Sequence, residues 1–163
     1  MTQGLAILCP SCGAPLGGRE GCQAQFDWLS ARAWENPARA AMHNMVVDTY
    51  AMQHPDDYCQ SPKSYAAHLT GLCCALEHPG DQKLYWQIPR WLDGPAQIVK
   101  PPVIETRGRK TIRTITDAAD AAYPSAVRQW ASAVWAAYAS QQYLARTWLA
   151  EAVRRVRSSD THP

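Results

Sequence analysis

The chain has 163 residues, a length that suits one domain with a sizeable core. Apolar residues make up 47% of it and charged residues 18%, which excludes an intrinsically disordered chain. The net charge of +2 is too small to indicate nucleic-acid binding by itself, and no run of about 18 apolar residues predicts a membrane span.

Residues 5–21 are rich in Cys, Gly and Pro and lack a helical period, so we expect a folded loop. Met1–Leu8 has no basic region before its short apolar run, which argues against a secretory signal. We therefore expect a cytoplasmic protein. In a reducing compartment, six cysteines are better explained as metal ligands and core thiols than as disulfides.

Three helices are expected in the first half of the chain. The first covers Cys22–Trp34. The second is signalled by Asn36 as a cap before Pro37 and runs to about Gln53. Ser61 before Pro62 gives the same signal for a third helix that reaches about Glu77. Because the second helix is apolar on most of its faces, we expect it to be central and buried.

The second half contains shorter elements and a connector. Residues 83–92 predict a short aromatic helix that Pro89 interrupts, and residues 94–113 predict a long connector. Thr116 is a candidate cap for a short helix that ends near Ala122. From Pro124 onward the apolar spacing predicts one long helix or two, with a break near Ser140.

No segment convincingly predicts a strand, so the expected fold class is all-α, a helical bundle with an N-terminal zinc-knuckle loop. We expect one domain over residues 1–163. Its parts are the knuckle loop 1–22, N-terminal helices 23–93, connector 94–115 and C-terminal helices 116–157.

Cys9-Pro-Ser-Cys12-Gly13 is the most specific motif in the chain. Two thiolates separated by two residues can bind one zinc ion from a tight turn, and Gly13 permits the backbone conformation that this turn requires. Cys22 follows closely, at the expected start of a helix, where a thiolate is favoured. The motif predicts one structural zinc ion with these three cysteines as ligands.

Zinc prefers four ligands, and helix geometry offers two histidines for the fourth. If the first two helices form an antiparallel hairpin, Cys22 lies level with about residue 50, nearer along the axis to His54 than to His43. Since these histidines are eleven residues apart, they point in similar directions. We favour His54, keep His43 as the alternative, and rank Cys59 third.

Asp48 and His68 are expected to face each other across the second and third helices. A carboxylate beside an imidazole can fix its tautomer in a catalytic base, or can form a buried pair that sets the packing. We favour the buried pair. The catalytic alternative takes Asp48 and His68 as the acid–base pair, with Tyr50 or Gln53 assisting a substrate.

Two basic stretches occur late in the chain, and we expect both to be mainly solvated faces. They consist of Arg107, Arg109, Lys110 and Arg113 in the connector, and Arg146, Arg154, Arg155 and Arg157 in the last helix.

The segment His43-Asn-Met-Val-Val-Asp-Thr-Tyr-Ala-Met-Gln-His-Pro55, taken with the cysteine motif and Ala67-His68-Leu69, resembles an uncharacterised bacterial family that is defined only as a domain of unknown function. The resemblance covers nearly the whole chain. It implies that five polar residues are characteristic of the family, and it supplies no activity. These residues are His43, Asp48, Tyr50, His54 and His68.

The sequence thus leaves the biochemical function unknown. We favour a small zinc-stabilised helical protein that acts as a binding or regulatory module, with a protein partner on a surface rich in Trp and Tyr. The alternatives are a hydrolase-type enzyme that uses Asp48 and His68, and a nucleic-acid-binding protein that uses its basic C-terminal helix.

Overall fold

The computed structural model describes residues 6–159, and their side chains as far as Arg155. Regular structure within this part is entirely helical, which confirms the expected all-α class. The first five residues of the N-terminal stretch and the side chain of Arg157 lie outside the described residues. None of the described helices is long and apolar enough to cross a membrane.

The first half of the chain forms α1 (Gly18–Ala31), η1 (Arg32–Trp34), α2 (Pro37–Gln53), α3 (Pro55–Tyr58) and α4 (Pro62–Glu77). The predicted cap at Asn36 is confirmed, since its side chain accepts a hydrogen bond from the Arg39 backbone at 2.9 Å. Ser61 forms a capping box with Ser64. Helix α1 begins four residues before the predicted start, because two glycines in its first turn weaken the helical signal there.

The second half forms α5 (Gln82–Tyr85), α6 (Gln87–Asp93), α7 (Arg113–Thr116), α8 (Tyr123–Ala137), η2 (Ala139–Gln141) and α9 (Gln142–Ser159). The expected interruption at Pro89 is wrong. The break falls at Trp86, and Pro89 lies in the first turn of α6, where a backbone N–H has no intrahelical partner to lose. The helix expected after Thr116 is also wrong, since α7 ends there. The break near Ser140 is confirmed.

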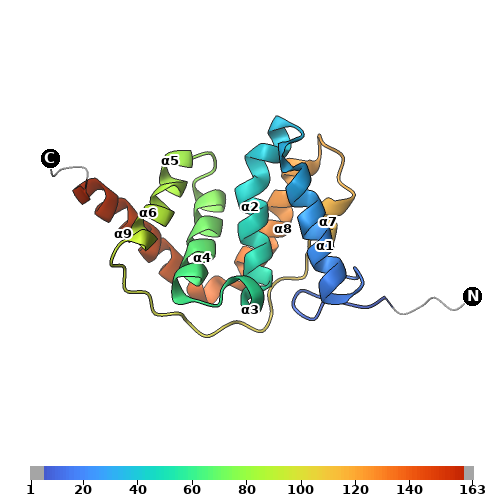
Figure 1. Ribbon diagram of the computed structural model, residues 1–163, viewed down its shortest axis with the longest axis horizontal. Helices are drawn as coiled ribbons and strands as arrows, with labels where there is room; N and C mark the ends of the chain where they lie inside the picture. The colour runs from blue at the N-terminus through green and yellow to red at the C-terminus, as the bar shows by residue number, and fades with distance from the viewer. Residues whose placement is uncertain (1–5, 160–163) are drawn as a thin grey trace, which may run out of the picture.

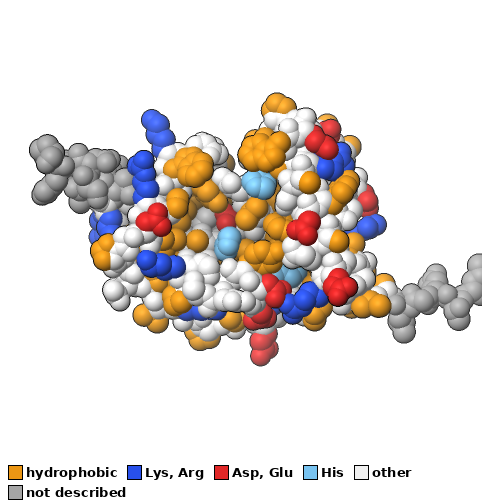
Figure 2. Space-filling view, in the orientation of Figure 1, with side chains coloured by type: hydrophobic (Ala, Val, Ile, Leu, Met, Phe, Trp, Pro, Cys, Tyr) orange, Lys and Arg blue, Asp and Glu red, His pale blue; other side chains and the backbone are white. Residues whose placement is uncertain are grey.

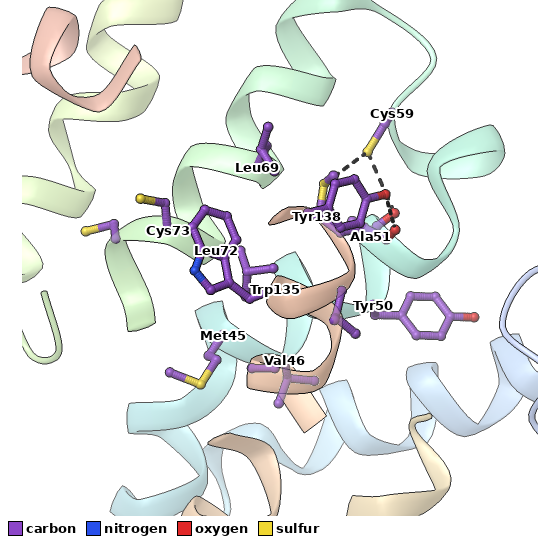
Figure 3. Packing of buried hydrophobic residues seen from close by; sticks show 14 of the residues in the cluster. Met45, Val46, Tyr50, Ala51, Cys59, Leu69, Leu72, Cys73, Trp135 and Tyr138 are labelled. Carbon is purple, nitrogen blue, oxygen red and sulfur yellow. Dashed lines mark hydrogen bonds between the residues drawn. The ribbon is translucent and has the colours of Figure 1, made fainter. Parts of the chain in front are cut away.

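Helix α2 lies at the centre of the arrangement, in contact with η1, α4 and α8 (Figure 1). Helices α6 and α9 cover the other side of α4, and the yellow connector that follows α6 runs below the ends of α4 and α2 (Figure 1). Three of the largest side chains buried in the core are Trp91, Trp130 and Tyr138. Figure 3 shows Leu69, Leu72 and Trp135 packed together, while Tyr50 points away from them.

Gln53 joins the connector to the helices. Its Nε2 donates to the backbone carbonyls of Arg107 at 2.9 Å and Lys110 at 2.7 Å, and its Oε1 accepts from Trp130 Nε1 at 2.9 Å. The Gln53 side chain is fully buried and its polar atoms are all engaged. Three segments distant in sequence therefore meet at one amide group.

We predict that Gln53→Met lowers the free energy of unfolding by about 3 kcal/mol, because it leaves buried donors and acceptors without partners. The midpoint of urea denaturation measures this loss. The control is Gln129→Met on an exposed face of α8, which should change stability by less than about 0.5 kcal/mol. Equal midpoints for the two variants would contradict the anchoring role of Gln53.

Candidate metal centre and polar pocket

Three cysteines and one histidine converge where the N-terminal loop meets α1 and the end of α2. The ligand atoms of Cys9, Cys12, Cys22 and His54 all lie within 4.8 Å of one another. Cys9, Cys22 and His54 are buried, and Cys12 is partly buried. This group could hold a metal ion.

Local backbone structure positions the two loop cysteines. Gly13 donates its N–H to the Cys9 carbonyl at 2.8 Å, and Cys9 donates its own to the Ala14 carbonyl at 2.9 Å. Gly13 has φ +77°, a left-handed conformation that costs glycine little. The tight turn therefore directs Cys9 and Cys12 to the same side.

His54 caps α2 and presents one specific ring nitrogen to the cysteines. Its Nδ1 donates to the Tyr50 carbonyl at 2.7 Å, since a carbonyl can only accept. Nε2 is then the nitrogen with a free lone pair, and it lies 3.6 Å from Cys9 Sγ and 3.5 Å from Cys22 Sγ. A backbone bond of this kind is a common support for a metal-binding histidine.

The thiols of Cys12 and Cys22 are coupled, with their sulfur atoms 3.7 Å apart. The hydrogen bond from Cys12 lowers the pKa of Cys22 well below its usual range, and bonds from His54 and Tyr50 act in the same direction. The pKa of Cys12 is raised because it donates that bond. Thiolate character is thus favoured at Cys22, and a thiolate is the form that ligates metal.

An aromatic wall closes this group. Tyr50 donates to Cys22 Sγ at 3.7 Å and stacks against His54 and Phe26, each with ring centroids 4.0 Å away. Arg107 extends the support, since it donates to the backbone carbonyls of Ser11 and Gln53. Tyr50 and Gln53, named as candidate substrate-assisting residues, both have these contacts within the packed protein.

The other two candidate ligands lie elsewhere. His43 is on the same helix as His54 but packs against Trp34, with ring centroids 5.4 Å apart. The Cys59 thiol is buried and donates to the Ala51 carbonyl (Figure 3). Cys22 lies in the second turn of α1, so the expected position at the helix start is corrected and the helix dipole acts on it less.

Asp48 and His68 form the expected pair, with Asp48 Oδ1 2.9 Å from His68 Nδ1. Tyr85, which the sequence reasoning did not identify, donates to Asp48 Oδ2 at 3.0 Å. Asp48 is 2% exposed, whereas the His68 side chain is 22% exposed. Burial raises the pKa of Asp48, although the bonds from His68 and Tyr85 oppose that rise.

Gly71 makes the depth of Asp48 possible. A Cβ atom added at this position would overlap Asp48 Oδ2 and lie 2.7 Å from Asp48 Cγ, so only glycine allows the carboxylate to pack on α4. A single glycine inside a helical pattern was the available sequence signal for this close approach.

His68 opens onto a pocket of about 550 Å³ between α2, α4, α5 and α6. Figure 2 shows a hollow on this face with histidine side chains and hydrophobic atoms in it. The apolar part of the wall is formed by Val47, Ala67, Ile88, Pro89 and Leu92. The pair is therefore divided, with a sealed carboxylate behind a partly open imidazole.

A family model described as "Family of unknown function (DUF5946)" matches residues 7–139 of the chain. No curated protein and no solved structure matches it.

We predict that His68→Ala lowers the free energy of unfolding by about 3 kcal/mol and Asp48→Asn by about 1.5 kcal/mol. Removing His68 leaves a buried carboxylate with one partner fewer, whereas an asparagine in place of Asp48 is neutral and can still bond both neighbours. Thermal or urea denaturation of the two variants measures the order. A larger loss for Asp48→Asn would contradict this account of the pair.

Gly71→Ala provides a test by sign. In an open helix this change stabilises by about 1 kcal/mol, but the clash with Asp48 should instead destabilise by about 2 kcal/mol. In Asp48→Ala, where the clashing oxygen is gone, the same change should regain much of that loss. A double-mutant cycle of denaturation midpoints measures this coupling, and simple additivity would show that the contact is absent.

Proposed function

We propose that this chain, which belongs to the DUF5946 family of unknown function, is a zinc-stabilised helical binding or regulatory module. In this proposal residues 1–163 form one domain, a helical bundle that carries a zinc knuckle at its N-terminal end. One zinc ion is bound by Cys9, Cys12, Cys22 and His54.

The separations within the ligand group support zinc. Tetrahedral coordination, with Zn–S near 2.3 Å and Zn–N near 2.0 Å, implies edges of about 3.8 Å between sulfurs and about 3.5 Å between sulfur and nitrogen. The Cys12–Cys22 sulfur separation is 3.7 Å, and His54 Nε2 lies 3.5 and 3.6 Å from two sulfurs. An ion of this size therefore fits between the ligands without rearrangement.

A site with three thiolates and one imidazole leaves no open position for a substrate, so we assign the ion a structural role. It would join the N-terminal loop, α1 and the end of α2, which otherwise meet through few polar contacts. Binding energy at such a site contributes directly to folding.

Exposed aromatic side chains are the feature that favours a protein partner. The side chains of Trp28, Trp34, Trp86 and Tyr143 are 45%, 72%, 62% and 81% exposed. Large aromatic groups contribute much of the binding energy at protein interfaces. The partner would contact this set, which is distributed over α1, η1, the α5–α6 junction and α9.

A second candidate function is acid–base catalysis of the hydrolase type, because His68 opens onto a pocket while Asp48 orients its ring. Nucleic-acid binding has less support. Arg146 pairs with Glu77 at 2.6 Å and Arg155 with Glu151 at 2.9 Å, so neighbouring carboxylates already neutralise part of the last helix.

We predict that the purified chain holds about one zinc ion and that Cys22→Ser loses it. The fold should then be destabilised, since metal binding and folding are coupled. Elemental analysis and denaturation midpoints with and without a strong chelator measure both effects. Cys73→Ala, which alters a buried thiol outside the group, should keep the metal. A chain that is free of metal and insensitive to chelator would refute the proposal.

His54→Ala should weaken zinc retention much more than His43→Ala, because His54 Nε2 faces the cysteines whereas His43 packs on Trp34. Cobalt(II) substitution gives a readout that stability alone does not alter, since its absorption reports tetrahedral thiolate coordination. A normal cobalt spectrum in His54→Ala, with a changed one in His43→Ala, would reverse the assignment.

A further inference from the structure

The pocket between α2, α4, α5 and α6 contains one ring nitrogen whose role the zinc proposal does not explain. His68 Nδ1 is bonded to Asp48, and the two nitrogens lie on opposite sides of the imidazole ring. Nε2 is therefore turned away from Asp48. It has no hydrogen-bond partner among the residues that the structure describes, and the ring lines the pocket.

Asp48 determines what Nε2 can bind. An ionised carboxylate only accepts hydrogen bonds, so the proton of a neutral His68 must be on Nδ1. Tyr85 holds the second carboxylate oxygen, which keeps Asp48 in this orientation. Nε2 then carries a lone pair and accepts a hydrogen bond from any group that enters.

The rest of the wall determines the body of the ligand. Most of it is apolar, and the volume of about 550 Å³ lies within the range of small-molecule sites. Two other polar side chains on the wall are already engaged. Lys63 Nζ donates to the carbonyls of Leu92 and Gly94, and Ser64 Oγ bonds within the α4 cap.

We propose that this pocket binds a small neutral molecule with an apolar body and a hydroxyl group, and that the hydroxyl donates its hydrogen bond to His68 Nε2. Asp48 acts as a positioning residue that keeps this nitrogen an acceptor. The site does not depend on the zinc ion, since none of its residues belongs to the metal group.

Asp48→Asn gives a test in which shape is retained and polarity is reversed. The new side-chain carbonyl can accept from Tyr85 while its amide N–H donates to His68 Nδ1. The proton of His68 then moves to Nε2, which becomes a donor. The variant should therefore lose its preference for a ligand that donates.

The probes are phenol and anisole, which have similar bodies and differ in the hydroxyl proton. NMR titration of the full chain, with labelled histidine, follows the His68 ring signals. Phenol should shift the Nε2 signal of the parent saturably, whereas anisole should not. The ratio of phenol to anisole affinity should fall about fivefold in Asp48→Asn, corresponding to one ordinary hydrogen bond.

Ala67→Phe is the matched control because it fills the pocket from α4 and leaves the Asp48–His68 bond in place. It should abolish binding of both probes with no change in the tautomer of His68. The proposal is overturned if phenol leaves the His68 signals of the parent unmoved, or if Ala67→Phe binds phenol unchanged. It is also overturned if the affinity ratio is the same in the parent and a folded Asp48→Asn variant.

Discussion

Burial of polar side chains on α2 is the constraint on which the arrangement of the other elements depends. Asp48, Gln53 and His54 are each 2% exposed or less, and a buried polar group without a partner is costly. Each finds its partners in a different part of the chain. Asp48 bonds α4 and α5, Gln53 bonds the connector and α8, and His54 faces the N-terminal loop and α1. The helix therefore positions its neighbours through polar contacts as well as apolar packing.

The direction in which these side chains point separates the two sites. Asp48 and His54 are six residues apart, which places them about 120° apart around the helix. One face of α2 consequently supports the cysteine group and another supports the pocket. No described side chain belongs to both sets. Each site can therefore vary in sequence without altering the ligands of the other.

Local signals in the sequence explain which features could be predicted. The bounds of α2 and α4 follow from a cap residue and a proline, and the grouping of Cys9 with Cys12 follows from a tight turn. The choice between His43 and His54 was harder, because eleven residues bring both to similar directions. It depends on how far α2 slides along α1, which the sequence pattern does not specify.

Features that depend on distant segments could not be predicted in the same way. Tyr85 reaches Asp48 because the chain breaks at Trp86, a position that has no strong helix-ending residue. The role of Gln53 requires two connector carbonyls and a tryptophan that lie more than 50 residues away. Such contacts are long-range consequences of packing, whereas Gly71 left a local trace as a glycine within a helix.

The cysteine and histidine group also has a temporal consequence during synthesis. Its four side chains all come from residues 9–54, which the ribosome completes in the first third of translation. The amide of Gln53, one residue before His54, must wait for Trp130. Since N-terminal segments emerge and fold first, an ion could be captured by a nascent chain whose main core does not yet exist. Metal supply would then act on the order of assembly, ahead of any effect on the finished protein.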